Sequence, residues 1–255
     1  MSTTELHELP TNAPKASIHI AIKPDEIFHI GSFKITNTYL SSLIVLAVFV
    51  VMCFYFLKNI RKNNYFVLIW KYILKTLWGT FEPITAEKTA VFAPVLISLF
   101  LFILFNNWFG LLPFVGSLTL SGIHGSFPLL KGATADLNTT LALSLVAVIY
   151  IQLQSIKYLG WKGFSQRFIR LTSPMNFFIG ILEIIEEFSK VISFAFRLFG
   201  NIFAGEVMLA VIAFLVPILA SFPFLVLEVF VGFVQALVFS MLVAVFLMSA
   251  TSKHH

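Results

Sequence analysis

The sequence predicts an all-α integral membrane protein with five transmembrane helices and one interfacial amphipathic helix. Hydrophobic residues make up 58% of the 255-residue chain and charged residues only 11%, whereas a soluble domain carries about 25% charged residues. Several apolar stretches also reach the length of about 20 residues that a helix needs to cross a bilayer. Together these observations exclude a soluble fold and favour a helical membrane domain.

The elements are expected in the following order. Residues 1–38 are polar, mixed in charge and interrupted by prolines, so we interpret them as a retained external arm rather than a cleaved signal peptide. Residues 39–251 then form a single helical membrane domain, followed by a cytoplasmic tail at 252–255. Its predicted transmembrane helices lie at roughly 39–57, 90–113, 138–156, 177–216 and 223–251.

The segment 64–82 lies between the first two of these helices and combines aromatic residues with lysines. This composition is typical of a helix lying in the membrane interface, and a short re-entrant segment is the alternative.

The basic residues indicate the orientation of the chain. Residues 58–75 contain five Lys or Arg residues and residues 157–170 contain four, and neither stretch contains an acid. The positive-inside rule places both loops in the cytoplasm. The N-terminal arm is then external and, after five spans, the C-terminus is cytoplasmic.

Several function classes are excluded. The basic residues flank apolar helices and no soluble basic domain exists, so nucleic-acid binding is not expected. The lone cysteine, Cys53, allows neither an internal disulfide nor a cysteine metal cluster. No phosphate-binding loop, metal-ligand cluster or nucleophile–base arrangement is present. We therefore expect no cofactor, no metal and no enzymatic site of the chain's own.

The apolar segment 177–216 is too long to cross a bilayer directly. At about 1.5 Å per residue it would extend roughly 60 Å, twice the hydrocarbon thickness of about 30 Å. It is therefore either broken or steeply tilted. A tilted pair of helices, 177–216 and 223–251, would suit packing along a curved partner.

Arg197 lies in the middle of this long apolar segment. A guanidinium is protonated at any physiological pH. Placing it at the bilayer centre costs roughly 2.5–3.5 kcal/mol on insertion scales and about 10–17 kcal/mol in simulations. Packing alone does not require such a group, so Arg197 is predicted to face a partner, a water-filled cavity or an ion path.

A stripe of polar residues at three- or four-residue spacing surrounds Arg197. Its members are Glu187, Lys190, Ser193, Arg197 and Asn201. Glu183 lies about 40° from Arg197 around the helix, whereas Glu206 points about 180° away and lies roughly 13–14 Å farther out. Acidic groups thus stand on both sides of the arginine, with Glu183, Glu186 and Glu187 on the cytoplasmic side.

The last helix carries Glu228 and Gln235, seven residues apart and so on one face. In an antiparallel pair, Arg197 would lie level with Gln235, and Glu206 level with Glu228. Two carboxylates at one depth in a low dielectric can share a proton, which suits a proton relay or ion site.

Structural alternatives remain open for the polar residues of both long helices. Glu186 and Glu187 could simply be solvated residues near the cytoplasmic entry of the helix. Lys190 could form an ion pair with either of them. For Gln235 the alternative is an interhelical hydrogen bond.

Three motifs resemble subunit a of F-type ATP synthase, in a bacterial-like form. The run Arg197-Leu198-Phe199-Gly200-Asn201-Ile202-Phe203-Ala204-Gly205-Glu206 resembles the family signature. The runs Asn107-Trp108-Phe109-Gly110-Leu111-Leu112-Pro113 and Asp136-Leu137-Asn138-Thr139-Thr140-Leu141 resemble a core helix and the start of the next one. The resemblance covers about 39–251.

This resemblance implies a stator of the Fo sector that faces a ring of c subunits, each with a membrane carboxylate. Two offset aqueous half-channels would carry protons to and from the ring, with Arg197 separating them and driving ion release. The outer half-channel would contain Glu206, Glu228, Asn107, Asn201 and Gln235. The cytoplasmic half-channel would contain Glu183, Lys190 and Ser193. Glu228 falls where some members have histidine, so the relay here would join two carboxylates.

The implied partners are the c ring, the b-subunit peripheral stalk, the rest of the synthase complex and membrane lipid. The implied location is the bacterial plasma membrane, with the mitochondrial inner membrane as the alternative. The alternatives for function are a Na⁺-translocating version of the same subunit, an independent secondary transporter or channel, and a structural membrane scaffold.

Overall fold

A computed structural model describes residues 26–30, 33–62, 64–112, 115, 119–122, 125–168, 174–215 and 221–252. Residues 1–25 of the predicted arm, residues 253–255 of the predicted tail and the predicted external turn at Pro217 lie outside this set. The described residues form five helices that are long and apolar enough to cross a membrane. This confirms the predicted all-α membrane fold.

The main elements follow the predicted order. The helices are α1 (Asn37–Asn59), α2 (Tyr65–Thr85), α3 (Thr89–Gly110), α4 (Leu137–Phe168), α5 (Pro174–Leu215) and α6 (Ser221–Thr251). Two short 3₁₀ helices, η1 (Ala86–Lys88) and η2 (Ala133–Ala135), precede α3 and α4. The predicted segment 64–82 is observed as helix α2, and its location at a membrane interface remains a prediction.

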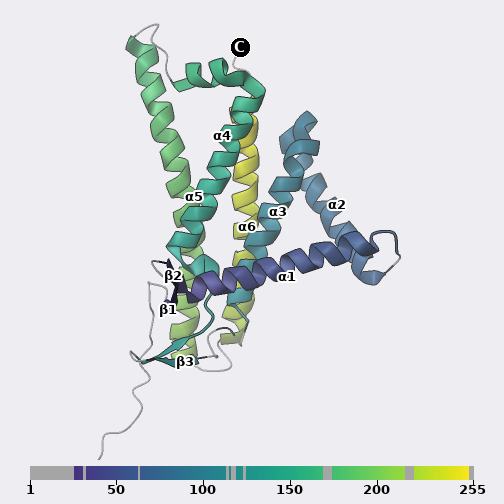
Figure 1. Ribbon diagram of the computed structural model, residues 1–255, viewed down its shortest axis with the longest axis vertical. Coiled ribbons are helices and arrows are strands. Elements are labelled where there is room, and N and C mark those ends of the chain that lie inside the picture. Colours follow the sequence, from purple (N-terminus) through teal and green to yellow (C-terminus); the bar gives the residue numbers. More distant parts are fainter. Residues whose placement is uncertain are drawn as a thin grey trace, which may run out of the picture.

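Two small antiparallel hairpins add to this helical scheme and were not predicted. Strand β1 (Glu26–Ile30) pairs with β2 (Phe33–Thr36), and β3 (Thr119–Gly122) pairs with β4 (Gly125–Pro128). Both hairpins lie toward the end of the molecule opposite the C-terminus (Figure 1).

The long helices form one bundle. In Figure 1, α5 and α6 extend along the long axis, with α4 packed against both and α3 packed on α6. Large aromatic and aliphatic side chains fill the space between them. Phe92, Ile151, Phe194, Leu198 and Phe239 are each at most 2% exposed. This core fixes α5 and α6 side by side, and these two helices carry most of the candidate functional residues.

Helix α5 is a single helix of 42 residues, about 63 Å long at 1.5 Å per residue. The predicted alternative of a broken helix is therefore wrong, and steep tilt remains. Helix α1 packs on α3 and extends at a large angle to the long axis of α5 and α6 in Figure 1. The tilt of the long pair relative to the membrane stays a prediction.

Helix α4 contains a sharp bend at Gly160, whose φ is 74° and ψ is 165°. This backbone region is essentially restricted to glycine because a Cβ atom would clash there. Residues 161–168 continue beyond the bend as a short helical arm that turns across the end of the bundle near the C-terminus (Figure 1). The sequence predicted a straight helix over 138–156 and not this arm.

The segment just before α4, which lies between the predicted helices 90–113 and 138–156, is buried. Leu130, Ala133 and Ala135 are each at most 7% exposed. The Nδ2 atom of Asn37 in α1 donates to the Pro128 carbonyl at 3.2 Å. These contacts pack the segment against the start of α1, so it closes the outer end of the bundle.

Asp136 joins this segment to two helices. Its Oδ1 accepts a hydrogen bond from the Asn138 backbone N–H at 3.0 Å, which caps the first turn of α4. Its Oδ2 accepts from the Thr38 hydroxyl of α1 at 2.9 Å. A single buried carboxylate therefore fixes α1 relative to α4.

Candidate functional site

Arg197 is an exposed residue of α5. Its Nη2 donates to Ser193 Oγ, one turn earlier, at 3.3 Å. The same helix exposes large apolar side chains nearby, including Ile192 (55%) and Phe196 (54%). Within the described residues, no carboxylate forms an ion pair with Arg197. The protein thus presents an unpaired cation on an apolar helix face.

One turn farther out, an amide pair links the two long helices. Asn201 Nδ2 of α5 donates to Gln235 Oε1 of α6 at 2.8 Å. Gln235 is only 4% exposed, and its Nε2 has no hydrogen-bond partner within the described residues. Gln235 was predicted level with Arg197, and its observed partner is the next polar residue of the stripe. This contact is the interhelical hydrogen bond that the sequence analysis gave as the structural alternative for Gln235.

Farther out again, the two predicted outer carboxylates meet at one pocket. The pocket is lined by Asn107, Gly110, Leu111, Gly132, Thr134, Ile202, Glu206 and Glu228. Glu228 is only 3% exposed, and its Oε1 is buried without a hydrogen-bond partner in the described part of the chain. The structure therefore brings Glu206, Glu228 and Asn107 together.

Glycines allow these carboxylates to lie against the backbone. A Cβ atom at Gly205 of α5 would overlap the Glu228 carboxylate, and one at Gly132 would lie 2.8 Å from Glu206 Oε1. Lys131, next to Gly132, also acts electrostatically on Glu206. The buried segment before α4 therefore contributes directly to this pocket, which the sequence analysis did not predict.

Asn107 has a structural contact in addition to its place in the pocket. Its Nδ2 donates to the Gly232 carbonyl of α6 at 2.9 Å. The neighbouring Trp108 indole N–H donates to the Val229 carbonyl at 3.0 Å. These two bonds hold the end of α3 against α6, so Asn107 also positions the helix that carries Glu228.

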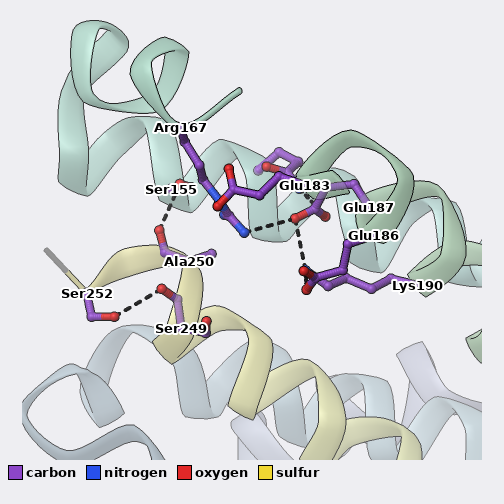
Figure 2. Close-up of polar contacts among 10 residues, drawn as sticks. Ser155, Arg167, Glu183, Glu186, Glu187, Lys190, Ser249, Ala250 and Ser252 are labelled. Carbon is purple, nitrogen blue, oxygen red and sulfur yellow. Dashed lines mark hydrogen bonds and ion pairs between the residues drawn. The ribbon is translucent and has the colours of Figure 1, made fainter. Parts of the chain in front are cut away.

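At the end of the bundle that carries the short helical arm of α4, charged residues form a connected cluster (Figure 2). Arg167 of the α4 arm lies 3.4 Å from Glu183 Oε1 through Nε and 3.3 Å from Glu187 Oε1 through Nη2. Lys190 pairs with Glu186 at 3.0 Å and with Glu187 at 2.9 Å. Lys190 is 7% exposed, whereas Glu186 is 57% exposed. The alternative of an ion pair for Lys190 is thus observed.

Two further contacts anchor this cluster to the bundle. Gln152 Nε2 of α4 donates to Glu187 Oε2 at 2.5 Å. The Lys190 ammonium lies 4.7 Å from the centre of the Phe246 ring of α6, a cation–π distance. The cluster therefore joins α4, α5 and α6.

Sequence reasoning missed Arg167 and Gln152 as members of this cluster. Arg167 was considered only as a basic loop residue, because its sequence separation from Glu183 and Glu187 follows no helical period. It reaches them only through the bend at Gly160 and the return of the chain into α5. Within the described residues, no group of three or more His, Cys, Asp or Glu side chains is arranged to hold a metal ion.

Two groups of polar residues thus lie along α5 on opposite sides of Arg197. The outer group is Glu206, Glu228 and Asn107, and the inner group is the cluster around Glu187 and Lys190. Such intramembrane charges mark ion paths more often than packing sites because burying them is costly. The arrangement is suited to passing ions along two separate routes.

Comparison with known proteins agrees with this chemistry. The family described as ATP synthase A chain matches residues 39–248. An ATP synthase subunit a of Moorella thermoacetica is 29% identical over 238 residues, covering 91% of this chain and 99% of its own length. That of Desulforamulus reducens is 31% identical over 249 residues, covering 93% and 88% respectively. That of Gloeobacter violaceus is 37% identical over 161 residues, covering 63% and 61%.

The matched region extends from the first turn of α1 to near the end of α6, and it contains Arg197, the outer pocket and the charged cluster around Glu187. This chain therefore belongs to the family of ATP synthase A chains, the subunit a of F-type ATP synthases.

Proposed function

We propose that this chain forms two offset half-channels for protons against a ring of c subunits, with Arg197 separating them. Family membership makes the chain an ion-translocating, multi-pass membrane subunit of an ATP synthase rather than its catalytic subunit. The half-channels, the role of Arg197 and the identity of the ion are the parts that go beyond membership.

The observation that carries the proposal is the exposed position of Arg197 on an apolar face of α5. A permanently charged guanidinium at membrane depth needs an anion or water. Its only hydrogen bond within the described residues is to a neutral serine hydroxyl. No described carboxylate supplies this anion, and a membrane carboxylate on each c subunit has the chemistry to do so.

The separation of the two polar groups supports two offset paths. Glu183 precedes Arg197 by 14 residues and Glu206 follows it by nine, which correspond to about 21 Å and about 13–14 Å along α5. The first group lies toward the bend of α4, and the second lies under the segment that closes the outer end. Arg197 therefore lies between the two paths, and a proton cannot pass directly from one path to the other without passing it.

The fixed cation then couples ion movement to ring rotation. A positive charge favours the ionised form of a carboxylate opposite it, so a proton leaves the ring site as that site approaches Arg197. The same charge repels protons and Na⁺ and blocks a direct path between the half-channels. Because one unit charge crossing 100 mV releases about 2.3 kcal/mol, ATP synthesis needs several ions and an interface without leaks.

The proposed setting is the bacterial plasma membrane, with the N-terminus outside and the C-terminus in the cytoplasm. The c ring and the b-subunit peripheral stalk are the proposed partners within the complex. Protons are favoured over Na⁺ because Glu206 and Glu228 share one pocket, as a carboxylate relay requires. No described group of acidic or histidine side chains is arranged to hold a metal ion.

The first test replaces Arg197 by alanine in the assembled complex. Membrane vesicles would be scored for ATP-driven proton pumping and for passive proton flux through the membrane sector. We expect coupled pumping to be lost while passive flux is retained or increased, since the barrier between the half-channels is gone. Lys62→Ala is the control, because it removes an exposed cation of the α1–α2 loop.

Normal coupling in Arg197→Ala would overturn the proposal and make the central charge structural. An independent transporter or a scaffold is distinguished by a second observation. Co-purification with a ring of small two-helix subunits is expected here, and either of those alternatives would yield the chain without such a ring.

A further inference from the structure

We propose that Arg167 is a positioning residue of the cytoplasmic half-channel, holding Glu183 in place beside the ion path. This inference rests on the proposed function, because it assumes that ions pass the cytoplasmic carboxylates of α5. It adds to that function a residue from another helix, which neither the spacing of the α5 stripe nor its chemistry indicates.

The first support is the geometry of the guanidinium. Arg167 lies 3.4 Å from Glu183 and 3.3 Å from Glu187, and its side chain is only 12% exposed (Figure 2). These two carboxylates lie four residues apart on α5, so they occupy one helix face. The Glu187 contact is a hydrogen bond, whereas the Glu183 contact is an ion pair in which Arg167 Nε makes no hydrogen bond within the described residues. A planar guanidinium can face both carboxylates at once, which a lysine at this position could do less well.

The second support is that the two carboxylates depend on Arg167 unequally. Glu187 also accepts from Lys190 at 2.9 Å and from Gln152 at 2.5 Å. For Glu183, Arg167 is the one partner within the described residues, and its Oε2 is buried with no hydrogen-bond partner there. Loss of Arg167 would therefore leave Glu187 held by two groups and Glu183 held by none.

The third support is the way in which the backbone of α4 places Arg167 against α5. The bend at Gly160 turns the arm of residues 161–168 out of the line of α4. Ser155 Oγ, just before the bend, donates to the Ala250 carbonyl at 2.8 Å, which fixes the base of the arm to α6. The arm is thus anchored at its base and carries Arg167 onto α5 at its far end.

The charge of the cluster makes this contact matter for ion movement. Three carboxylates (Glu183, Glu186 and Glu187) and two cations (Arg167 and Lys190) leave a net charge of −1 when all are ionised. Removing Arg167 changes it to −2 and leaves a partly buried carboxylate unpaired. Ions would then meet a different charge and a displaced Glu183 on this path.

The competing explanation is that Arg167 only fastens the arm to α5. That role would change how much of the subunit is assembled, but not the rate of each assembled complex. The two explanations are therefore separated by rates that are normalised to the amount of subunit in the purified complex.

The experiment compares four variants in the complete ATP synthase in inverted membrane vesicles. Arg167→Gln removes the charge, Arg167→Lys keeps it, and Arg167→Gln with Glu187→Gln keeps the net charge of the cluster while leaving Glu183 unpaired. Lys162→Gln is the matched control, since Lys162 is an exposed cation on the same arm without an ion pair in the described residues. Each is scored for proton pumping per assembled complex, and for passive flux when combined with Arg197→Ala.

We expect Arg167→Gln and the double variant to lower both rates about fivefold or more, within the usual range of coupling between neighbouring residues. Arg167→Lys is expected to recover most of the rate, and Lys162→Gln to match the unmodified protein. If Arg167→Gln prevents assembly, the double variant and Arg167→Lys still decide the question through the same rates.

The inference is overturned if rates per complex are unchanged and only the amount of complex falls. It is also overturned if the double variant restores the normal rate, because net charge rather than the position of Glu183 would then be what matters. Failure of the proposed function gives a different result, since Arg197→Ala alone would then leave pumping coupled without leak.

Discussion

At the residue scale, Glu206 and Glu228 each approach a glycine so closely that no side chain fits there. Gly205 and Gly132 are the neighbours, and a Cβ atom on either would collide with one of the two carboxylates. In an apolar environment, two neighbouring carboxylates cannot easily both be charged. Their place in one pocket is consistent with the proposed outer half-channel.

Replacing Glu206 by glutamine keeps its shape and removes its ability to exchange a proton. We expect ATP-driven pumping to slow in the assembled complex, by roughly the 10²-fold or more typical of losing a proton-transfer group. Passive leak should not rise, because Arg197 still separates the paths. The measurement is pumping and leak in the same vesicles.

Glu82→Gln is a suitable control for this change, since Glu82 is an exposed carboxylate of α2 outside the pocket. Unchanged pumping in Glu206→Gln would remove Glu206 from the outer path. A leak in that variant would instead indicate that the pocket, rather than Arg197, forms the barrier.

At the element scale, the bend of α4 and the continuity of α5 act together. Helix α5 extends without interruption over 42 residues, so its charged groups keep a fixed angular relation to Arg197. Helix α4 is bent at Gly160, so its last turns leave α6 and meet the N-terminal half of α5. A straight α4 would leave Glu183 without its partner.

Gly160→Ala is expected to strain this bend, because its φ of 74° and ψ of 165° lie in a region that residues with a Cβ rarely adopt. The cost is about 1–3 kcal/mol, enough to displace or loosen the arm. Limited proteolysis of inverted vesicles should then cleave residues 161–168 faster than in the unmodified protein.

Gly79→Ala is the matched control for this measurement, because an added Cβ at Gly79 meets nothing within 4 Å and its backbone is helical. Equal cleavage rates for all three proteins would show that the arm does not depend on the glycine conformation. Slower pumping in Gly160→Ala would also be expected, since the bend carries Arg167.

At the scale of the whole molecule, two helices expose long apolar surfaces for different reasons. Only 11% of the most apolar window of α1 and 17% of that of α5 are buried within the chain. Helix α1 exposes apolar side chains such as Val51 and Phe54, whereas α5 exposes apolar side chains together with Arg197. A surface for lipid needs no charge, so the α5 face is the one suited to a ring of carboxylates.

The orientation of the molecule gives a prediction at this scale. With Cys53 changed to serine, a cysteine at Lys62 or at Ser252 should react with a membrane-impermeant maleimide in inverted vesicles and not in right-side-out ones. A cysteine at Asn138, which begins the outer end of α4 and is exposed, should react in the opposite way.

This expected labelling pattern follows from the positive-inside rule. Labelling of Lys62 and Asn138 from the same side would mean that the segment between them, which contains α2 and α3, does not cross the membrane as a single span. Labelling in the reverse sense would invert the assignment of the inner and outer half-channels.

The helices and the α5 stripe were predictable because their signals are local. Apolar length located the five long helices to within a few residues at most ends. Helical periodicity placed Glu187, Lys190, Ser193, Arg197 and Asn201 on neighbouring faces. The antiparallel pairing of the two long helices also predicted that Glu206 and Glu228 would lie at the same level, and both line one pocket.

The remaining features depend on contacts between residues far apart in the chain. The two hairpins, the burial of residues 130–136 and the Arg167 ion pairs were not predicted. The close approach of carboxylates to Gly205 and Gly132 could not be predicted either, because those carboxylates come from other helices. No repeating period connects such residues.

The sequence by itself determined that this is a helical membrane protein with a charged residue, Arg197, that packing does not explain, because hydrophobicity and the cost of burying charge are properties of each segment. Tertiary structure alone decided which groups face one another: Arg167 with Glu183 across the bend of α4, Asn201 with Gln235, and Glu228 with the backbone of Gly205. The physical reason is that these contacts depend on helix packing and on one glycine torsion, which are set only when the whole bundle has formed.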